Sequence, residues 1–62
     1  MKCKCIKDYS DGNIDFKADE VYVYNTVPTS SQFPPVYEIY NGKLRQKIFS
    51  NAEFKTYFRR VV

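Results

Sequence analysis

The sequence predicts an all-β domain of five short strands, with one helical turn before the last strand. Three observations lead to this fold class. The chain of 62 residues has room for one domain, which spans residues 1–62. Its apolar and polar residues alternate with the period of two that is typical of half-buried strands. Only Phe49–Phe58 shows the spacing of a helix.

Aromatic residues supply the material for a core in this short chain. A domain of this size buries only about 60% of the surface that its unfolded chain exposes, so its stability is marginal. Six Tyr and five Phe compensate, since each can bury roughly 150–250 Å². The absence of His removes the side chain that titrates near neutral pH. We therefore expect no enzymatic activity.

The first strand is expected at Lys2–Lys7, with Met1, Cys3 and Cys5 on one face. A disulfide between the two cysteines is disfavoured, because strand residues two apart have parallel side chains and Cα atoms about 7 Å apart. Zinc takes about four ligands, which two cysteines without histidine do not supply. We expect no metal and no cofactor, and we interpret both cysteines as small buried hydrophobic residues.

The segment Asp8–Asp19 is predicted to be a polar loop with a turn at Asp11-Gly12-Asn13. Its four aspartates lack the spacing of an EF-hand, so we interpret it as a solvated acidic loop. Ile14 and Phe16 lie two apart and are expected to point inward together.

A second strand is predicted at Glu20–Val27, where valines and tyrosines alternate. Val21 and Val23 share one face and Tyr22 and Tyr24 share the other. The periodicity leaves open which face is buried, because both residue types are favoured in strands.

The segment Pro28–Pro35 is predicted to be a loop that enters the next strand in an extended conformation. Phe33 is its one aromatic residue. It is either an exposed binding anchor or a side chain that folds back on the core, and we expect the second.

A hairpin is predicted around Asn41-Gly42, between strands at Val36–Tyr40 and Lys43–Phe49. This dipeptide is the strongest short-range signal for a two-residue type I′ turn. Such a turn pairs Tyr40 with Lys43 and Glu38 with Arg45. It places on one face Tyr37, Ile39, Leu44, Gln46 and Ile48, and on the other Val36, Glu38, Tyr40, Lys43, Arg45, Lys47 and Phe49.

A short helix is predicted within Phe49–Phe58, where Ser50 and Glu53 form a capping-box pattern. Its apolar face carries Phe54, Tyr57 and Phe58. So short a helix is unstable alone and must dock on the sheet. Arg59–Val62 is then expected to form the last strand.

The element order is typical of an SH3-like barrel. An OB-type barrel is the alternative, but it usually has a longer helix between its third and fourth strands, which a tight turn is predicted to join here.

Charge is unevenly distributed along the chain. Residues 1–42 have a net charge of −2, whereas residues 43–62 have a net charge of +5. A basic segment favours an acidic partner, either a protein surface or a nucleic acid. No apolar run is long enough to span a membrane, and the first residues lack the apolar stretch of a secretory signal. We therefore expect a cytoplasmic protein with reduced cysteines.

Several of these segments together resemble a loose group of very short proteins encoded in phages and mobile elements of low-GC Gram-positive bacteria. The resemblance lies in the opening MKCKCI, the Asp-rich loop to Phe16, the Tyr22-x-Tyr24 strand, Tyr40-Asn41-Gly42 and the closing FSNAEFKTYF. It implies an SH3-like barrel in the cytoplasm of a bacterial host. It also implies an accessory role, since some members bind host proteins or block defence systems.

Two binding functions follow as hypotheses. The first is a non-enzymatic protein-binding module, an inhibitor of a host or defence protein, whose partner is a host or phage protein. The second is a nucleic-acid-binding barrel in which basic residues contact phosphates and aromatic residues stack on bases. Both use residues from one set: Tyr40, Lys43, Arg45, Lys47, Phe49, Arg59 and Arg60. A receptor for proline-rich peptides is less favoured, because such grooves usually contain Trp, which this chain lacks.

Overall fold

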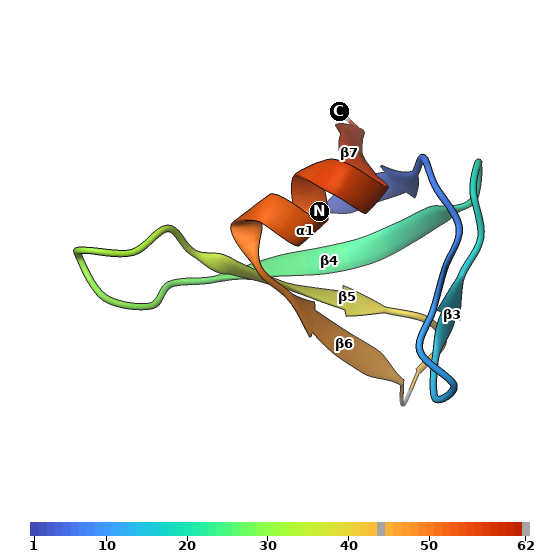
Figure 1. Cartoon of the computed structure of the whole chain (residues 1–62), viewed down its shortest axis with the longest axis horizontal. Helices are drawn as coiled ribbons and strands as arrows, with labels where there is room; N and C mark the ends of the chain where they lie inside the picture. Colours follow the sequence, from blue (N-terminus) through green and yellow to red (C-terminus); the bar gives the residue numbers. More distant parts are fainter. Residues whose placement is uncertain (44, 62) are drawn as a thin grey trace.

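Five antiparallel strands form one sheet in the order β6-β5-β4-β1-β7, and a small β2–β3 hairpin lies beside it (Figure 1). The computed structural model describes residues 1–43 and 45–61. Its elements are β1 (Lys2–Cys5), β2 (Tyr9–Ser10), β3 (Asp15–Phe16), β4 (Val21–Val27), β5 (Val36–Tyr40), β6 (Gln46–Phe49), α1 (Asn51–Tyr57) and β7 (Phe58–Val61). The predicted mostly β fold with one short helix before the last strand is confirmed.

The longest strand, β4, joins the two halves of the sheet. Its first residues pair with β1, and residues from Val23 to Val27 pair with β5. On its other side β1 pairs with β7, so the first and last strands of the chain are neighbours. Among the described residues, β6 and β7 are the two edges of the sheet, and no pairing closes it into a barrel.

The inner face of β4 is the tyrosine face. Tyr24 is buried and Tyr22 is half-buried, whereas Val21 and Val23 are each about half exposed. The structure therefore decides the question that the alternation of valine and tyrosine leaves open. The larger side chains fill the core, and the smaller β-branched ones face solvent.

The segment predicted to be a polar loop contains the β2–β3 hairpin, which sequence reasoning missed. Asp11 organises its turn, because its carboxylate accepts hydrogen bonds from the backbone N–H groups of Asn13 and Ile14, at 2.9 and 3.0 Å. Ile14 and Phe16 are both buried, as predicted. The turn therefore positions two apolar side chains under an otherwise polar segment.

The β5–β6 hairpin forms, but the predicted two-residue turn is wrong. Tyr40 pairs with Gln46 and Tyr37 with Phe49, and the Asn41 N–H donates to the Arg45 carbonyl at 2.9 Å. The connection therefore spans residues 41–45, of which Leu44 lies outside the described residues. A type I′ turn needs a positive φ at both central positions. Gly42 has a φ of 90°, but Asn41 does not have a positive φ, since Asp19 is the only described non-glycine residue that does.

This change of register moves the side chains of β6 to the opposite faces. The pairing differs from the predicted one by an odd number of residues, which exchanges the faces of a strand. Phe49, predicted to point outward, is fully buried, and Ile48 is exposed. The predicted Glu38–Arg45 pair is also wrong, because Glu38 lies opposite Ile48. Burial of a phenylalanine outweighs the turn preference of two residues.

The helix begins as the sequence predicts. The Ser50 hydroxyl accepts from the Glu53 N–H, and the Glu53 carboxylate accepts from the Ser50 N–H, so both bonds of the capping box are present. Phe54 is the buried residue of α1, and it stacks on Tyr37 with ring centroids 4.0 Å apart. The helix is thereby held against the sheet.

Aromatic rings dominate the core. Phe16, Phe49 and Phe58 meet edge to face, with centroid separations between 5.2 and 5.7 Å. The two predicted buried cysteines are confirmed, since both are fully buried and unpaired. Among the described residues, the buried ones are Cys3, Cys5, Ile14, Phe16, Tyr24, Tyr37, Ile39, Phe49, Phe54 and Phe58.

Within residues 1–43 and 45–61, no helix has the length and apolar character needed to cross a membrane.

Candidate binding surfaces

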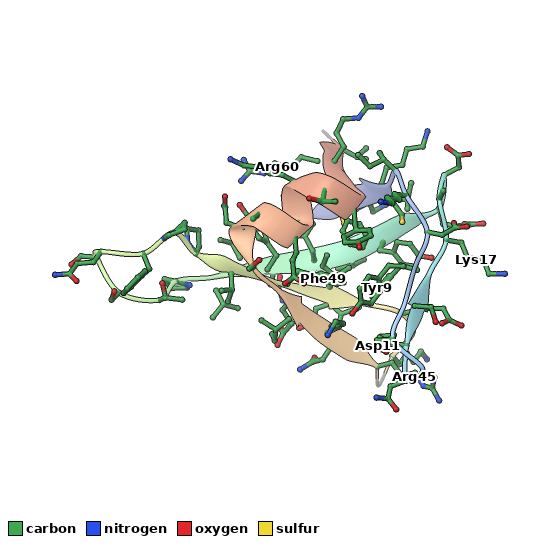
Figure 2. All side chains as sticks on the ribbon, in the orientation of Figure 1. Tyr9, Asp11, Lys17, Arg45, Phe49 and Arg60 are labelled. Atoms are coloured by element: carbon green, nitrogen blue, oxygen red, sulfur yellow. The ribbon has the colours of Figure 1, made fainter. Side chains whose placement is uncertain are left out.

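The basic residues predicted to form one site lie at two separate ends of the molecule. Figure 2 shows Arg45 at the end that carries the β2–β3 hairpin and Arg60 beside α1. Lys43 and Lys47 belong to the first end, and Arg59 belongs with Arg60 on β7, at the opposite edge of the sheet. The positive charge of the C-terminal third therefore does not form a single stripe.

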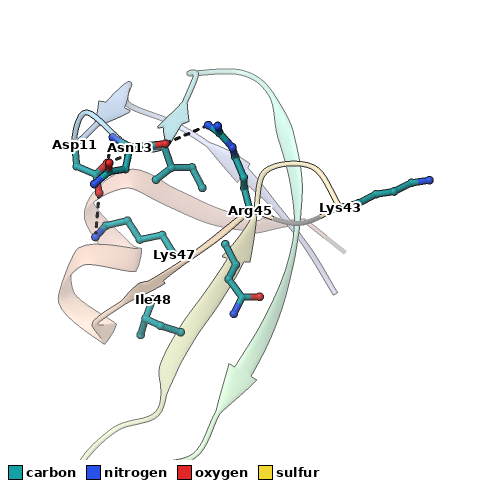
Figure 3. Close-up of a pocket in the computed structure, with 8 residues that line it drawn as sticks. Asp11, Asn13, Lys43, Arg45, Lys47 and Ile48 are labelled. Carbon is teal, nitrogen blue, oxygen red and sulfur yellow. Dashed lines mark hydrogen bonds and ion pairs between the residues drawn. The ribbon is translucent and has the colours of Figure 1, made fainter.

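At the first end, Arg45 and Lys47 line a groove between β6 and the β2–β3 turn (Figure 3). The Arg45 Nη1 donates to the Asn13 carbonyl at 3.2 Å, and the Lys47 Nζ lies 3.4 Å from the Asp11 Oδ2. Lys43 also lines the groove, but the end of its side chain points away from it (Figure 3). This hairpin groove is lined by Asp11, Asn13, Ile14, Lys43, Arg45, Gln46, Lys47 and Ile48.

The charged pair in the hairpin groove attaches the β2–β3 turn to the sheet. The backbone N–H groups of Asn13 and Ile14, together with the Lys47 ammonium, lower the pKa of the Asp11 carboxyl. The Tyr9 hydroxyl and the Asp11 carboxylate raise the pKa of Lys47. The Lys47 ammonium also lies 5.6 Å from the centre of the Tyr9 ring. Lys47 and Arg45 are therefore engaged within the protein.

The two aromatic residues of the predicted binding set, Tyr40 and Phe49, lie in different surroundings. Phe49 is fully buried, so it is removed from the predicted binding set. Tyr40 is half-buried on the outer side of the sheet, where its hydroxyl donates to the Glu38 carboxylate and accepts from the Asn25 Nδ2 at 3.2 Å. The hydrogen bond to Glu38 raises the pKa of Tyr40. Its ring is therefore held in place on an accessible face.

The outer sheet face is the surface opposite the aromatic core, and its residues follow from the strand register. Val23 lies between Lys2 and Tyr40, and Val27 lies opposite Val36. The face is lined by Lys2, Lys4, Val21, Val23, Asn25, Val27, Val36, Glu38, Tyr40, Gln46, Ile48, Arg59 and Val61. Directly opposite side chains are about 4.5–5.5 Å apart at Cβ, so these residues form a continuous surface.

Apolar side chains on this face are unusually accessible. Val21, Val23 and Ile48 are 51%, 50% and 48% exposed. Sequence reasoning missed the two valines as site residues, although their alternation with the tyrosines was the signal that could have identified them. The alternation alone does not say which face of β4 is exposed, because this depends on the tyrosines being packed in the core.

Positive charge gathers at the β1–β7 side of the outer sheet face. Lys4 lies directly opposite both Val21 and Arg59, and Lys2 lies opposite Val23. One carboxylate, that of Asp19, is 3.8 Å from the Lys4 Nζ. The Lys4 and Asp19 side chains are 40% and 90% exposed, so this pair contributes little to stability. The face thus has an apolar centre and a basic side.

Phe33 is 67% exposed in the loop between β4 and β5, so the expectation that it folds back on the core is wrong. The loop extends well away from the sheet (Figure 1). The Thr29 hydroxyl donates to the Pro34 carbonyl at 3.1 Å and ties the two sides of the loop together. Too few apolar neighbours lie in this polar segment to draw the ring inward.

A second groove lies between α1 and β7. It is lined by Ile6, Tyr37, Asn51, Phe54, Lys55, Phe58, Arg59 and Arg60. We name it the helix groove. It brings together Arg59 and Arg60, the two basic residues of the predicted site that the hairpin groove leaves out.

The thiols are the remaining reactive groups. Burial raises the pKa of Cys3 to about 11, and burial also raises the pKa of Cys5. Both thiols are therefore protonated and inert at neutral pH. In the part of the chain that the structure describes, no group of three or more His, Cys, Asp or Glu side chains is placed to hold a metal ion.

Comparisons of the chain with protein-family models, with curated proteins and with solved structures gave no match.

Proposed function

We propose that this protein is a non-enzymatic protein-binding module that contacts its partner through the outer sheet face. The observation that carries the proposal is the set of half-exposed apolar side chains on this face, Val21 and Val23 on β4 and Ile48 on β6. Val23 lies between Lys2 and the held Tyr40, and Val21 lies opposite Lys4. Ile48 lies opposite Glu38. Contiguous exposed apolar surface with a polar rim is typical of protein interaction sites.

The total surface of the protein leaves room for a standard protein interface. The protein exposes 4539 Å² in total. A standard interface buries about 800 Å² on each partner, which is roughly a sixth of this surface. A partner with an apolar centre and carboxylates opposite Lys2, Lys4 and Arg59 complements the face in both apolar surface and charge.

Nucleic-acid binding is supported less well. Arg45 and Lys47 make hydrogen bonds and ion pairs within the protein, so a phosphate would have to displace them. Phe49, which was expected to stack on bases, is buried. A binding strip for a nucleic-acid backbone needs several accessible cations in series, whereas these lie at opposite ends of the sheet.

We further propose that the sheet is a small SH3-like barrel. Two contacts between distant strands support strong curvature. The rings of Phe49 on β6 and Phe58 on β7 lie 5.2 Å apart, although these strands are the two edges of the sheet. The Arg60 Nη2 on β7 donates to the Tyr37 hydroxyl on β5 at 2.9 Å. The edges therefore approach each other through the core, as they do in a barrel.

Within the class of binding modules, we favour an inhibitor of a bacterial host or defence protein. This part of the proposal rests on the resemblance to short phage-encoded proteins. A small, aromatic-rich domain is also suited to blocking a surface of another protein without performing chemistry.

Affinity capture from a lysate of a low-GC Gram-positive bacterium tests the proposal. We expect one protein to be retained at high salt and after nuclease treatment. The double variant Val21→Thr/Val23→Thr should lose it, because threonine keeps the strand preference but removes apolar surface. The control Phe33→Ser removes a still more exposed apolar group elsewhere and should retain the partner.

Two outcomes would overturn the proposed function. Retention that disappears with nuclease or salt would favour nucleic acid. Loss of the partner in Phe33→Ser but not in the valine variant would move the binding site to the β4–β5 loop. Circular dichroism of each variant shows whether the fold is intact.

A further inference from the structure

The helix groove has an aromatic floor and a basic rim. Tyr37, Phe54 and Phe58 are buried beneath it, whereas Lys55, Arg59 and Arg60 are exposed around it. Ile6 lies at the same groove and is 47% exposed. The groove therefore offers apolar and positively charged contacts side by side.

Arg60 is held in position before any ligand arrives. Its guanidinium lies 5.9 Å from the centre of the Tyr37 ring, and its Nη2 donates to the Tyr37 hydroxyl at 2.9 Å. The Asn51 Nδ2 lies 3.4 Å from the same hydroxyl. A guanidinium has five N–H donors, and one hydrogen bond to Tyr37 leaves others for a carboxylate. Such preorganisation lowers the entropic cost of binding.

Within residues 1–43 and 45–61, no Asp or Glu side chain lines the groove. The eight lining residues include three cations. The nearest acidic residue of the helix is Glu53, whose carboxylate accepts from the Ser50 N–H at 3.1 Å in the capping box. The positive charge of the rim is thus not neutralised from within the groove, and a negatively charged ligand is the complementary one.

The buried aromatic rings beneath the groove favour a peptide over a nucleic acid as its ligand. Tyr37 and Phe54 stack with an interplanar angle of 14°, and Phe54 and Phe58 stack with an angle of 18°. These rings use their faces against one another and are almost fully buried. Base recognition by stacking needs an open ring face. A protein side chain needs only the apolar surface that Ile6 and the ring edges offer.

We propose that the helix groove binds an acidic peptide segment in which carboxylates flank one apolar side chain. A carboxylate accepts two hydrogen bonds from Arg60, in the bidentate geometry that arginine favours. The apolar side chain lies against Ile6 and the edges of Phe54 and Phe58. This site lies apart from the apolar centre of the outer sheet face and shares with that face only Arg59.

Titration of the full chain with short peptides, followed by amide and methyl chemical shifts, tests the proposal. The first peptide carries one leucine between pairs of glutamates, the second replaces the glutamates with glutamines, and the third replaces the leucine with serine. We expect saturable shifts at Ile6, Phe54 and Arg60 with the first peptide only. An oligothymidylate serves as the nucleic-acid probe.

Variants assign the binding to the groove. Arg60→Gln should weaken the acidic peptide about tenfold or more, because a charge-assisted hydrogen bond is lost. Arg60→Lys should also weaken it, since lysine lacks the bidentate geometry. Lys43→Gln is the matched control: it removes the same charge at the far end of the sheet and should leave the affinity within about twofold, through screened long-range attraction alone.

Three results would overturn the proposal: equal binding of the neutral peptide, equal weakening by Arg60→Gln and Lys43→Gln, or preferred binding of the oligothymidylate. Arg59→Gln provides a second test if Arg60→Gln disturbs the fold. Among the described hydrogen bonds, the Tyr37 hydroxyl is bonded to the side chains of Arg60 and Asn51 and not to that of Arg59. The valine variants of the outer sheet face should bind the peptide normally, so the two proposals can fail independently.

Discussion

The two faces of the five-stranded sheet differ in what their side chains do. On the inner face, Tyr24, Tyr37 and Phe49 are almost fully buried and make ring contacts. On the outer face, Val21 and Val23 of the same central strand are half exposed. A single strand thus contributes large side chains to stability and small apolar ones to an accessible surface.

This difference teaches where the stability of a very small domain originates. Its helix and its β2–β3 hairpin both cover the inner face, through Phe54 and Phe16 respectively. No described element covers the outer face. Substitutions on the inner face should therefore affect folding, whereas those on the outer face should affect binding. The following predictions test this separation, from the largest expected effect to the smallest.

The largest effect is expected from Phe49→Ala. Removing a buried phenylalanine costs about 3–5 kcal/mol, which is comparable to the whole stability of a domain of this size. We expect loss of the cooperative transition in urea, followed by circular dichroism. A two-residue turn would place Phe49 outside, where the same change costs within about 0.5 kcal/mol. A near-normal midpoint would therefore contradict the observed register.

A smaller effect is expected from Ser50→Ala at the start of α1. The variant loses the hydrogen bond from the Glu53 N–H to the Ser50 hydroxyl, and loss of such a cap costs about 1 kcal/mol. The midpoint of urea unfolding measures it. Thr56→Ala is the control, because this exposed hydroxyl donates to the Ala52 carbonyl within the helix and caps no terminus. Equal effects of both changes would contradict a specific role for the cap.

The attachment of the β2–β3 turn should depend on pH. The pKa of Asp11 is lowered in the folded protein, so its contribution to stability is complete above the ordinary pKa of about 3.9. The contribution is lost as the pH falls through the lowered folded-state value. We expect Asp11→Asn to make unfolding less dependent on pH below about 4.

The control for this prediction is Asp19→Asn, which changes a carboxylate that is 90% exposed and only loosely paired with Lys4. Its unfolding profile in acid should follow that of the unmodified protein. An unchanged acid profile in Asp11→Asn would show that the carboxylate charge does not hold the turn.

The smallest effect on stability is expected from Val23→Thr on the outer face. Threonine is also β-branched, and an exposed substitution of this kind changes the free energy of unfolding by within about 0.5 kcal/mol. The urea midpoint should therefore stay close to that of the unmodified protein while partner capture weakens. A large loss of stability would show that this face is packed in the isolated protein and would remove the separation between the two faces.

Much of the fold was predictable from local patterns. The period of two at Lys2–Lys7 and Glu20–Val27 predicted two strands, and Ser50 with Glu53 predicted the start of the helix, all confirmed by the structure. These features depend on residues that are neighbours in sequence. Hydrogen bonds of a cap and the alternation of a strand act over a few residues, so they can be read without the rest of the chain.

The candidate site was less predictable, because it depends on register and on which face is buried. Asn41-Gly42 favoured a tight turn, yet the five-residue connection brings Phe49 into contact with Phe16 and Phe58. The basic residues of the last third lie close together in the sequence, but the fold places them at both edges of the sheet.

The sequence by itself determined the strands of the main sheet, the helix, the burial of the cysteines and the excess of positive charge in its last third. Only the tertiary structure decided that Phe49 is inside, that Val21 and Val23 are outside, and that Arg60 meets Tyr37 across the curved sheet. The physical reason is the range of the forces. Caps and alternation are local, whereas burial of six aromatic side chains in one core is a property of the whole chain, and its gain outweighs the preference of any single turn.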